Sequence, residues 1–202
     1  MTIPGTVPER QVRALFTAST VTVYQAYSPD IADSALSAGT LVPPFKLDRM
    51  TWIKPSFLWM MHRSGWATKP GQERVLAIQI TRDGFEWALG HATLSHNDPA
   101  VYATHDEWTA LKKASSVRVQ WDPERSLGLH ALPWRTIQIG LSGEAVGRYV
   151  DQWITAITDI TPLAGRIRHN LNSGHFDAAQ AELPAEQVYP LPDKLRANLG
   201  AT

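Results

Sequence analysis

The stretch TVTVYQAYSPDIADSALSAG, residues 20–39, decides the fold because it encodes a strand followed directly by a helix. β-branched and aromatic residues dominate residues 20–27, a composition typical of a strand. Ser28 and Pro29 suit the N-cap and first turn of a helix, and Gly39 suits its C-terminal end. We therefore expect a strand at 20–27 and a helix that ends at Gly39.

The rest of the chain adds strands and helices without regular alternation. We expect strands at 49–53, 74–81, 117–121 and 135–141, and helices at 55–63, 83–89, 143–158 and 161–171. The continuous apolar run of 74–81 indicates a central strand, residues 91–104 read as a polar loop, and residues 122–133 read as a long connection. This order predicts an α+β fold with a mixed, mostly antiparallel sheet and flanking helices.

The length of the chain fits one domain with a full core. We expect a flexible N-terminal tail at 1–8, a single α+β domain at 9–172, and a C-terminal extension at 173–202 that wraps the surface. Residues 1–13 lack the apolar core of a signal peptide, and no apolar run is long enough to span a bilayer. These features predict a cytoplasmic protein without a membrane partner, and they leave its oligomeric state open.

Several kinds of chemistry are excluded by what the sequence lacks. It contains no cysteine, so disulfides, thiolate catalysis and cysteine-bound metals are ruled out. Phosphate-loop, dinucleotide-fingerprint, HExxH and GxSxG motifs do not occur. His91, His96 and His105 have a spacing unlike known metal sets. We predict no metal site.

The segment RMTWIKPSFLWMMHRSGW, residues 49–66, carries the strongest functional signal. Trp52 and Trp59 offer flat rings on which a base can stack, and Arg49, Lys54 and Arg63 offer positive charge for phosphate. This combination predicts a site for a nucleotide or an RNA end. The alternative interpretation places both rings in the core and the cations on a solvated helix face.

Positive charge is concentrated around that segment although the whole chain is neutral. Seven Lys or Arg and two Asp or Glu lie in residues 46–82, a local balance of +5. Lys54 directly precedes a predicted helix whose first N–H groups are free, and Lys54, the Ser56 hydroxyl and this helix N-terminus together form a candidate anion seat. In the alternative interpretation Ser56 only starts the helix and Lys54 is a surface charge.

Two glutamines lie in the middle of predicted strands. Gln25 is flanked by Tyr24 and Tyr27, and Gln138 lies in residues 135–141. A buried amide without partners costs about 1–3 kcal/mol, so each requires a hydrogen-bond partner. A ligand or a neighbouring backbone could supply it, and both glutamines could flank one cleft.

The sequence resembles the family called domain of unknown function 4291. The segments that carry this resemblance are VYQAY (23–27), RMTWIKPSFLWM (49–60), QERVLAI (72–78), QWDPER (120–125) and IQIGL (137–141). The opening strand and helix also resemble ADP-ribosyltransferase-type domains, a resemblance that implies NAD as cofactor. It places Gln25 where that superfamily has a ribose-contacting histidine, and Thr51 or Trp52 on the second strand.

The same resemblance assigns Gln138 to the position that often holds a catalytic glutamate. A glutamine cannot supply that carboxylate, so Glu144 or Glu124 would have to replace it. The implied activity is a nucleotide-binding, NAD-using transferase that acts on nucleic acid or protein. One alternative is a non-catalytic binder of RNA or nucleotide, and another is a protein-interaction domain anchored by its tryptophans.

The candidate site residues therefore form two groups. The catalytic candidates are Gln25, Gln138 and Glu144. The ligand-binding candidates are Tyr24, Tyr27, Arg49, Thr51, Trp52, Lys54, Ser56, Trp59 and Arg63.

Overall fold

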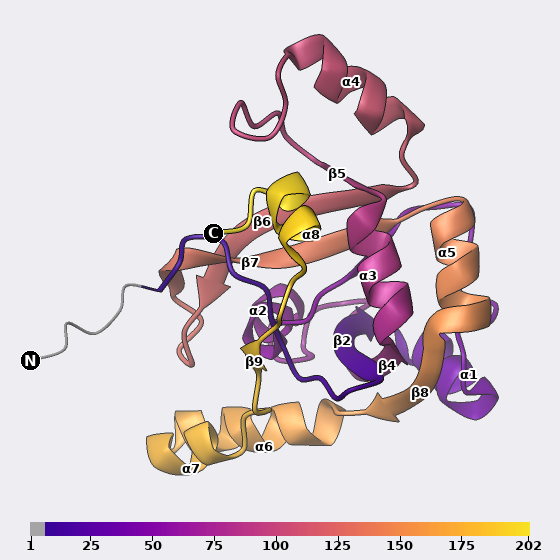
Figure 1. The fold of residues 1–202 in the computed structure, drawn as a ribbon. Coiled ribbons are helices and arrows are strands. Elements are labelled where there is room, and N and C mark those ends of the chain that lie inside the picture. The colour runs from indigo at the N-terminus through magenta and orange to yellow at the C-terminus, as the bar shows by residue number, and fades with distance from the viewer. Residues whose placement is uncertain (1–6) are drawn as a thin grey trace, which may run out of the picture.

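The computed structural model describes residues 7–202, which form two sheets surrounded by helices (Figure 1). Most of the tail expected at 1–8 lies outside the described residues. The strands pair mostly antiparallel, so the α+β class is confirmed. Within residues 7–202, no helix has the length and apolar character that crossing a membrane requires.

The first sheet has three strands in the order β2 (Thr20–Tyr27), β4 (Arg74–Thr81) and β8 (Ile154–Asp159). All its pairings are antiparallel. The expected strand at 20–27 and the helix after it, α1 (Pro29–Ala38), are both confirmed. β4 is the central strand, as its continuous apolar run predicted, because it lies between β2 and β8. Other elements cover both of its faces, which explains the apolar run.

The second sheet has four strands in the order β3 (Thr51–Ile53), β7 (Ala131–Leu141), β6 (Val117–Arg125) and β5 (Ala92–Leu94). Its β5–β6 pair is parallel and its other pairs are antiparallel. β6 and β7 form a long antiparallel hairpin. Its apolar face shares the main core with one face of the first sheet.

The two sheets meet at a single bridge between Tyr24 of β2 and Lys54, which directly follows β3. The Tyr24 amide donates to the Lys54 carbonyl at 2.7 Å. Beyond this bridge the sheets belong to separate hydrogen-bonded ladders. Side chains of β2 and β3 can therefore reach across a gap that backbone pairing does not close.

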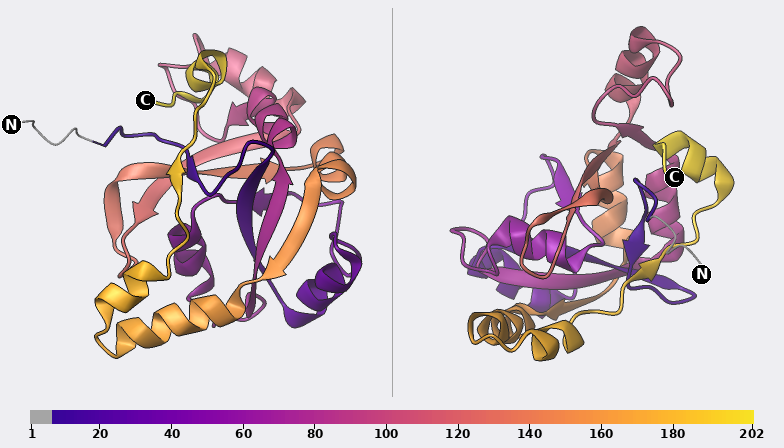
Figure 2. Two further views of the ribbon diagram at one scale, coloured as in Figure 1. Left: turned by 60° about the horizontal axis from the view of Figure 1, so that its bottom comes forward. Right: turned by 90° about the vertical axis from the view of Figure 1, so that its left-hand side faces the viewer.

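The helices cover the sheets on several sides. They are α2 (Phe57–Ser64), α3 (Arg82–Gly90), α4 (His105–Ala114), α5 (Glu144–Arg148), the π-helical turn η1 (Tyr149–Trp153), α6 (Thr161–Asn172), α7 (Phe176–Ala181) and α8 (Asp193–Leu199). α2 and α6 pack on one face of the first sheet, where Tyr24, Phe57 and Ile167 form a second core cluster. α4 projects away from the body and buries none of its residues (Figures 1 and 2).

Three expectations were wrong at the level of elements. The helix expected at 143–158 becomes α5, then η1, then strand β8, since residues 154–159 pair with β4. The connection expected at 122–133 is largely strand, because β6 runs to Arg125 and β7 begins at Ala131. Residues 92–94, expected to be a loop, form the short strand β5 beside β6.

The C-terminal residues return to the start of the chain. β9 (Gln187–Val188) pairs with β1 (Arg13–Ala14), and the Thr202 amide donates to the Arg10 carbonyl. Tyr189, Leu191 and Leu199 are buried in the main core.

Candidate functional site

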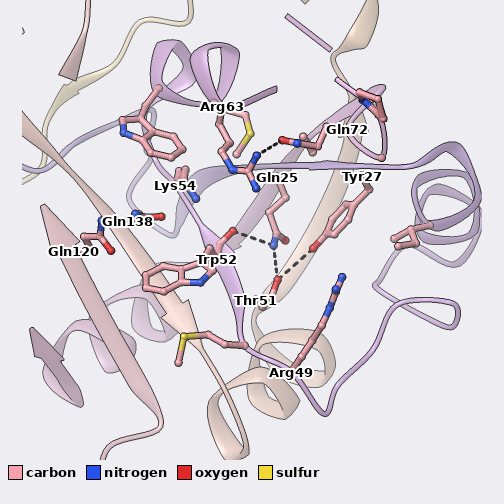
Figure 3. A pocket seen from close by; sticks show the side chains of 17 residues that line it. Gln25, Tyr27, Arg49, Thr51, Trp52, Lys54, Arg63, Gln72, Gln120 and Gln138 are labelled. Carbon is pink, nitrogen blue, oxygen red and sulfur yellow. Dashed lines mark hydrogen bonds between the residues drawn. The ribbon is translucent and has the colours of Figure 1, made fainter. Parts of the chain in front are cut away.

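A cavity of about 570 Å³ opens where β2 and β3 diverge. Its walls come from β2, β3, α2, the turn at 70–72 and the paired strands β6 and β7 (Figure 3). Nine of the predicted site residues line it, namely Gln25, Tyr27, Arg49, Thr51, Trp52, Lys54, Trp59, Arg63 and Gln138. Segments far apart in the sequence thus contribute to one space.

Gln25 is buried, and both the nitrogen and the oxygen of its side-chain amide form hydrogen bonds with protein groups. Its Nε2 donates to Thr51 Oγ1 at 2.7 Å and to the Trp52 carbonyl at 3.2 Å. Its Oε1 accepts from the Tyr149 hydroxyl at 2.8 Å. The Tyr27 hydroxyl adds a 3.3 Å contact with Thr51 Oγ1. Gln25 therefore ties β2 to β3 and to η1, and its partner is the protein rather than a ligand.

Lys54 is only 4% exposed although it carries an amine. Its Nζ lies 4.5 Å from the ring centroid of Trp59 and 6.0 Å from that of Trp52. Burial, and then the positive charge of Arg63, lower the pKa of Lys54 to about 7, while Asp122 acts in the opposite direction. No hydrogen bond or salt bridge of this amine is found among residues 7–202.

The lining contains three cationic side chains, Arg49, Lys54 and Arg63, and no Asp or Glu among its described residues. None of the three forms a salt bridge within residues 7–202. The Arg63 guanidinium donates to Gln72 Oε1 at 2.9 Å, which links α2 to the turn beside it. The cavity therefore has a positive lining without a compensating carboxylate at its surface.

Two glutamines face each other on β6 and β7 at one wall of the cavity. Gln120 pairs directly with Gln138, and both donate to the carboxylate of Asp122, at 2.8 and 2.6 Å. Their amide oxygens have no hydrogen-bond partner among residues 7–202. These oxygens are acceptors that a ligand hydroxyl or amino group can use.

Sequence reasoning missed Gln72, Gln120 and Asp122 as members of this region. A two-residue spacing places Gln120 and Asp122 on the same face of one strand, and this signal could have found them. Nothing in the sequence singles out Gln72, which lies in the turn after Gly71.

Gly140 makes room for the Trp52 ring. It lies opposite Trp52 in the β3–β7 pair, and a Cβ at this position would come within 3.0 Å of the indole and 2.7 Å of the Met50 sulfur. Trp59 lines the same cavity from α2, and its buried indole N–H has no partner among residues 7–202. Both rings are part of the cavity wall while remaining partly buried.

Three predicted site residues lie elsewhere. Tyr24 is buried in the second core cluster, where its ring packs edge-on against Phe57. Glu144 lies at the start of α5 with a largely exposed side chain and pairs with Arg148, so it does not replace a carboxylate in the cavity. Ser56 caps α2, accepting from the Trp59 amide at 3.1 Å and donating to Glu124 at 2.9 Å.

Ser56 instead borders a second cavity of about 550 Å³ that also contains Glu124 and Glu186. The Phe57 amide donates to Glu186 Oε1 at 2.6 Å, so this carboxyl group also holds the start of α2. Burial raises the pKa of Glu186 to about 8; the Phe57 amide lowers it and the charge of Glu124 raises it. Burial also raises the pKa of Glu124.

Within residues 7–202, no group of three or more His, Cys, Asp or Glu side chains is arranged to hold a metal ion. The cavity lining provides polar amides, indoles and cations instead. These groups suit an organic anion better than a metal cation.

Comparison with known proteins places the chain in one family. No curated protein matches the sequence. The family model described as "Domain of unknown function (DUF4291)" matches residues 11–189, and the chain therefore belongs to that family.

Proposed function

We propose that the cavity between β2 and β3 binds a nucleotide. The observation that carries this proposal is its lining, which combines two arginines, Lys54 and two indoles with no carboxylate among the described residues. Cationic side chains bind phosphate, and indole rings stack on a planar base. Burial first, and then the charge of Arg63, lower the pKa of Lys54, and an anionic ligand would offset the second of these effects.

The polar wall suits a ribose. The amide oxygens of Gln120 and Gln138 accept hydrogen bonds, and ribose hydroxyls donate them. Phosphates are held by Arg49 and Arg63, which approach the cavity from different sides (Figure 3). The proposed ligand is therefore a base, a ribose and at least one phosphate, as in NAD, ADP-ribose, ATP or an RNA end.

ADP-ribosyl transfer from NAD is a second candidate function. It is favoured by the convergence of Gln25, Thr51 and Gln138 on one cavity, as the resemblance to that superfamily implied. The position of the usual glutamate is held by the amide of Gln138, and the nearest carboxylate to it is Asp122, which accepts its hydrogen bond. Binding is thus better supported than transfer that depends on a carboxylate.

A thermal-shift and tryptophan-fluorescence screen with NAD, ADP-ribose, ATP and short RNA tests the proposal. Ligands that bind the native state raise the melting temperature by mass action. We expect at least one nucleotide to raise it, and Arg63→Gln to diminish that shift. Arg168→Gln is the matched control, because Arg168 is exposed on α6 and does not line the cavity.

The same screen separates the candidates. Nicotinamide release from NAD supports transfer, and binding without release supports a binding module. An RNA-only shift that falls steeply with salt supports an RNA-binding module. No shift with any ligand, together with a dimer that buries Trp52 or Trp59, would replace the proposal with a protein-interaction role.

A further inference from the structure

We propose that Lys54 is a nucleophile that forms an imine with the open-chain aldehyde of a phosphorylated ribose bound in this cavity. The inference rests on the proposed nucleotide site and goes beyond it by naming a reactive atom and a substrate class. Lysine amines form such imines with carbonyl substrates when they are desolvated or lie near another cation.

The position of Lys54 fits a nucleophile better than a simple phosphate clamp. A charged lysine is normally hydrated or paired with a carboxylate, because burying an uncompensated ammonium is costly. Lys54 is 4% exposed, borders the cavity, and has no hydrogen bond or salt bridge within residues 7–202. Trp52 and Trp59 flank its amine and offer no lone pair to accept a proton.

The electrostatic balance favours a neutral amine near pH 7. Burial and the charge of Arg63 lower the pKa of Lys54 to about 7, and Asp122 opposes them. Indole faces favour the ammonium form. Desolvation, which can lower the pKa of a buried lysine by up to about 3–5 units, outweighs this effect of the rings.

The chemical step is balanced without a further reactant. The Nζ lone pair attacks the aldehyde carbon, and the carbonyl π electrons move to oxygen. One amine proton passes to that oxygen to give a carbinolamine. Loss of water then forms the C=N bond, and hydrolysis reverses the sequence.

The cavity chemistry indicates which aldehydes fit. Ribose 5-phosphate and ADP-ribose both present an aldehyde at C1 of the open-chain ribose, together with phosphate groups for Arg49 and Arg63. ADP-ribose adds a base that can stack on an indole. NAD carries the same phosphates and adenine, but its corresponding carbon is bonded to nicotinamide, so NAD can compete for the site without forming an imine.

Reductive trapping tests the proposal on the full chain. The protein is incubated at pH 7 with cyanoborohydride and either ribose 5-phosphate, ADP-ribose or unphosphorylated ribose, and labelled lysines are mapped by peptide mass. We expect at least about tenfold more label on Lys54 than on any other lysine, because a typical lysine is less than about 0.1% neutral at this pH. NAD should protect Lys54, and ADP-ribose should label it at lower concentration than ribose 5-phosphate.

The outcomes test the nucleophile, the nucleotide site and the substrate class separately. Lys54→Met should remove the dominant label, whereas Lys113→Met, at an exposed lysine on α4, should retain it. Label confined to exposed lysines while NAD still raises the melting temperature would overturn the nucleophile and keep the nucleotide site. Equal labelling of Lys54 by ribose and ribose 5-phosphate would overturn the phosphorylated substrate class. The site map of the wild-type protein needs no variant, so it decides the matter even if Lys54→Met fails to fold.

Discussion

Buried polar side chains determine how this cavity is built. The sequence predicted that Gln25 needs partners, and it could not say which, because the partners come from β3 and η1, which are distant in the chain. Gln25, which the sequence suggested as a catalytic residue, uses both of its amide N–H groups and its amide oxygen in hydrogen bonds to the protein. Its role in this structure is to position β3 beside β2.

Gln25→Ala should lower the free energy of unfolding by about 2 kcal/mol or more, because it leaves the buried Tyr149 hydroxyl without its partner and removes both side-chain hydrogen bonds from Gln25 to β3. Denaturant unfolding measures the change. Gln79→Ala is the matched control, since Gln79 is also in the middle of a strand but exposed. A change of the same small size in both variants would show that the Gln25 network does not join the sheets.

Glu186 should make stability depend on pH. Burial, opposed by the Phe57 amide and assisted by Glu124, raises its pKa from 4.5 to about 8. Between these values the folded state holds a proton that the unfolded state has released, so the free energy of unfolding falls as pH rises. Glu186→Gln cannot ionise and retains an acceptor for the Phe57 amide.

We therefore expect Glu186→Gln to match wild type near pH 5 and to exceed it by about 1 kcal/mol or more at pH 8. Chemical unfolding at the two pH values checks this difference. Glu144→Gln, at a side chain that is 61% exposed, should show no comparable pH-dependent gain. Equal stability of Glu186→Gln and wild type at both pH values would mean that Glu186 is ionised in the fold.

At the scale of elements, local sequence patterns predicted those strands and helices whose residue types alone favour the element. β2, α1, β4 and α6 follow from strand composition, capping residues and helical spacing. Residues 143–158 were misread because Val146, Tyr149, Val150 and Trp153 continue at helical spacing up to the boundary. The next residues include the β-branched Ile154 and Thr155, and β4 has a free edge that they complete.

The parts of β6 and β7 that extend into residues 122–133 were missed for a different reason. Pro123 lies inside β6, and proline normally argues against a strand interior. The strand accommodates it with a register shift between Pro123 and Arg125. Asp122, the first residue beyond the expected strand, therefore stays in the hairpin and accepts hydrogen bonds from Gln120 and Gln138.

Close packing of α3 against η1 depends on Gly84. A Cβ at Gly84 would lie 2.3 Å from the Trp153 ring, which is buried and has little room to shift. Gly84→Ala should therefore destabilise the protein by about 1–3 kcal/mol despite the higher helix propensity of alanine. Thermal or denaturant unfolding provides the measurement.

Gly147→Ala is the matched control for Gly84→Ala. Gly147 lies in α5, and a Cβ there would meet nothing within 4 Å. This variant should be neutral or more stable by up to about 1 kcal/mol. If Gly84→Ala were equally well tolerated, α3 and η1 would have to be packed less closely than described.

At the scale of the whole molecule, the two ends of the described chain close the same core. Leu199 of α8 is fully buried, and its carbonyl accepts from the Trp121 indole N–H at 2.8 Å. Leu199→Ala should lower the free energy of unfolding by about 2–5 kcal/mol. Leu111→Ala, at a leucine of α4 that is 45% exposed, should change it by no more than about 0.5 kcal/mol.

Comparable small effects of both leucine variants in denaturant unfolding would show that α8 is only loosely attached. The expected large difference would show that the C-terminal residues are part of the folding unit.

The candidate site was predictable in composition but not in arrangement. Trp52, Trp59, Arg49, Lys54 and Arg63 could be identified from one segment because their types suit a nucleotide. Their convergence with β6 and β7, and the exclusion of Tyr24, Ser56 and Glu144, depend on where the two sheets meet. That topology arises from long-range pairing, which residue types within single segments do not specify.

The most direct test of the account is a calorimetric titration of the full chain with ADP, which contains a base, a ribose and a diphosphate. We predict saturable binding that weakens at least several-fold in Arg63→Gln, is unchanged in Arg168→Gln, and weakens with rising salt. Absence of binding, or an affinity that Arg63→Gln leaves unchanged, would contradict the assignment of this cavity as a nucleotide site.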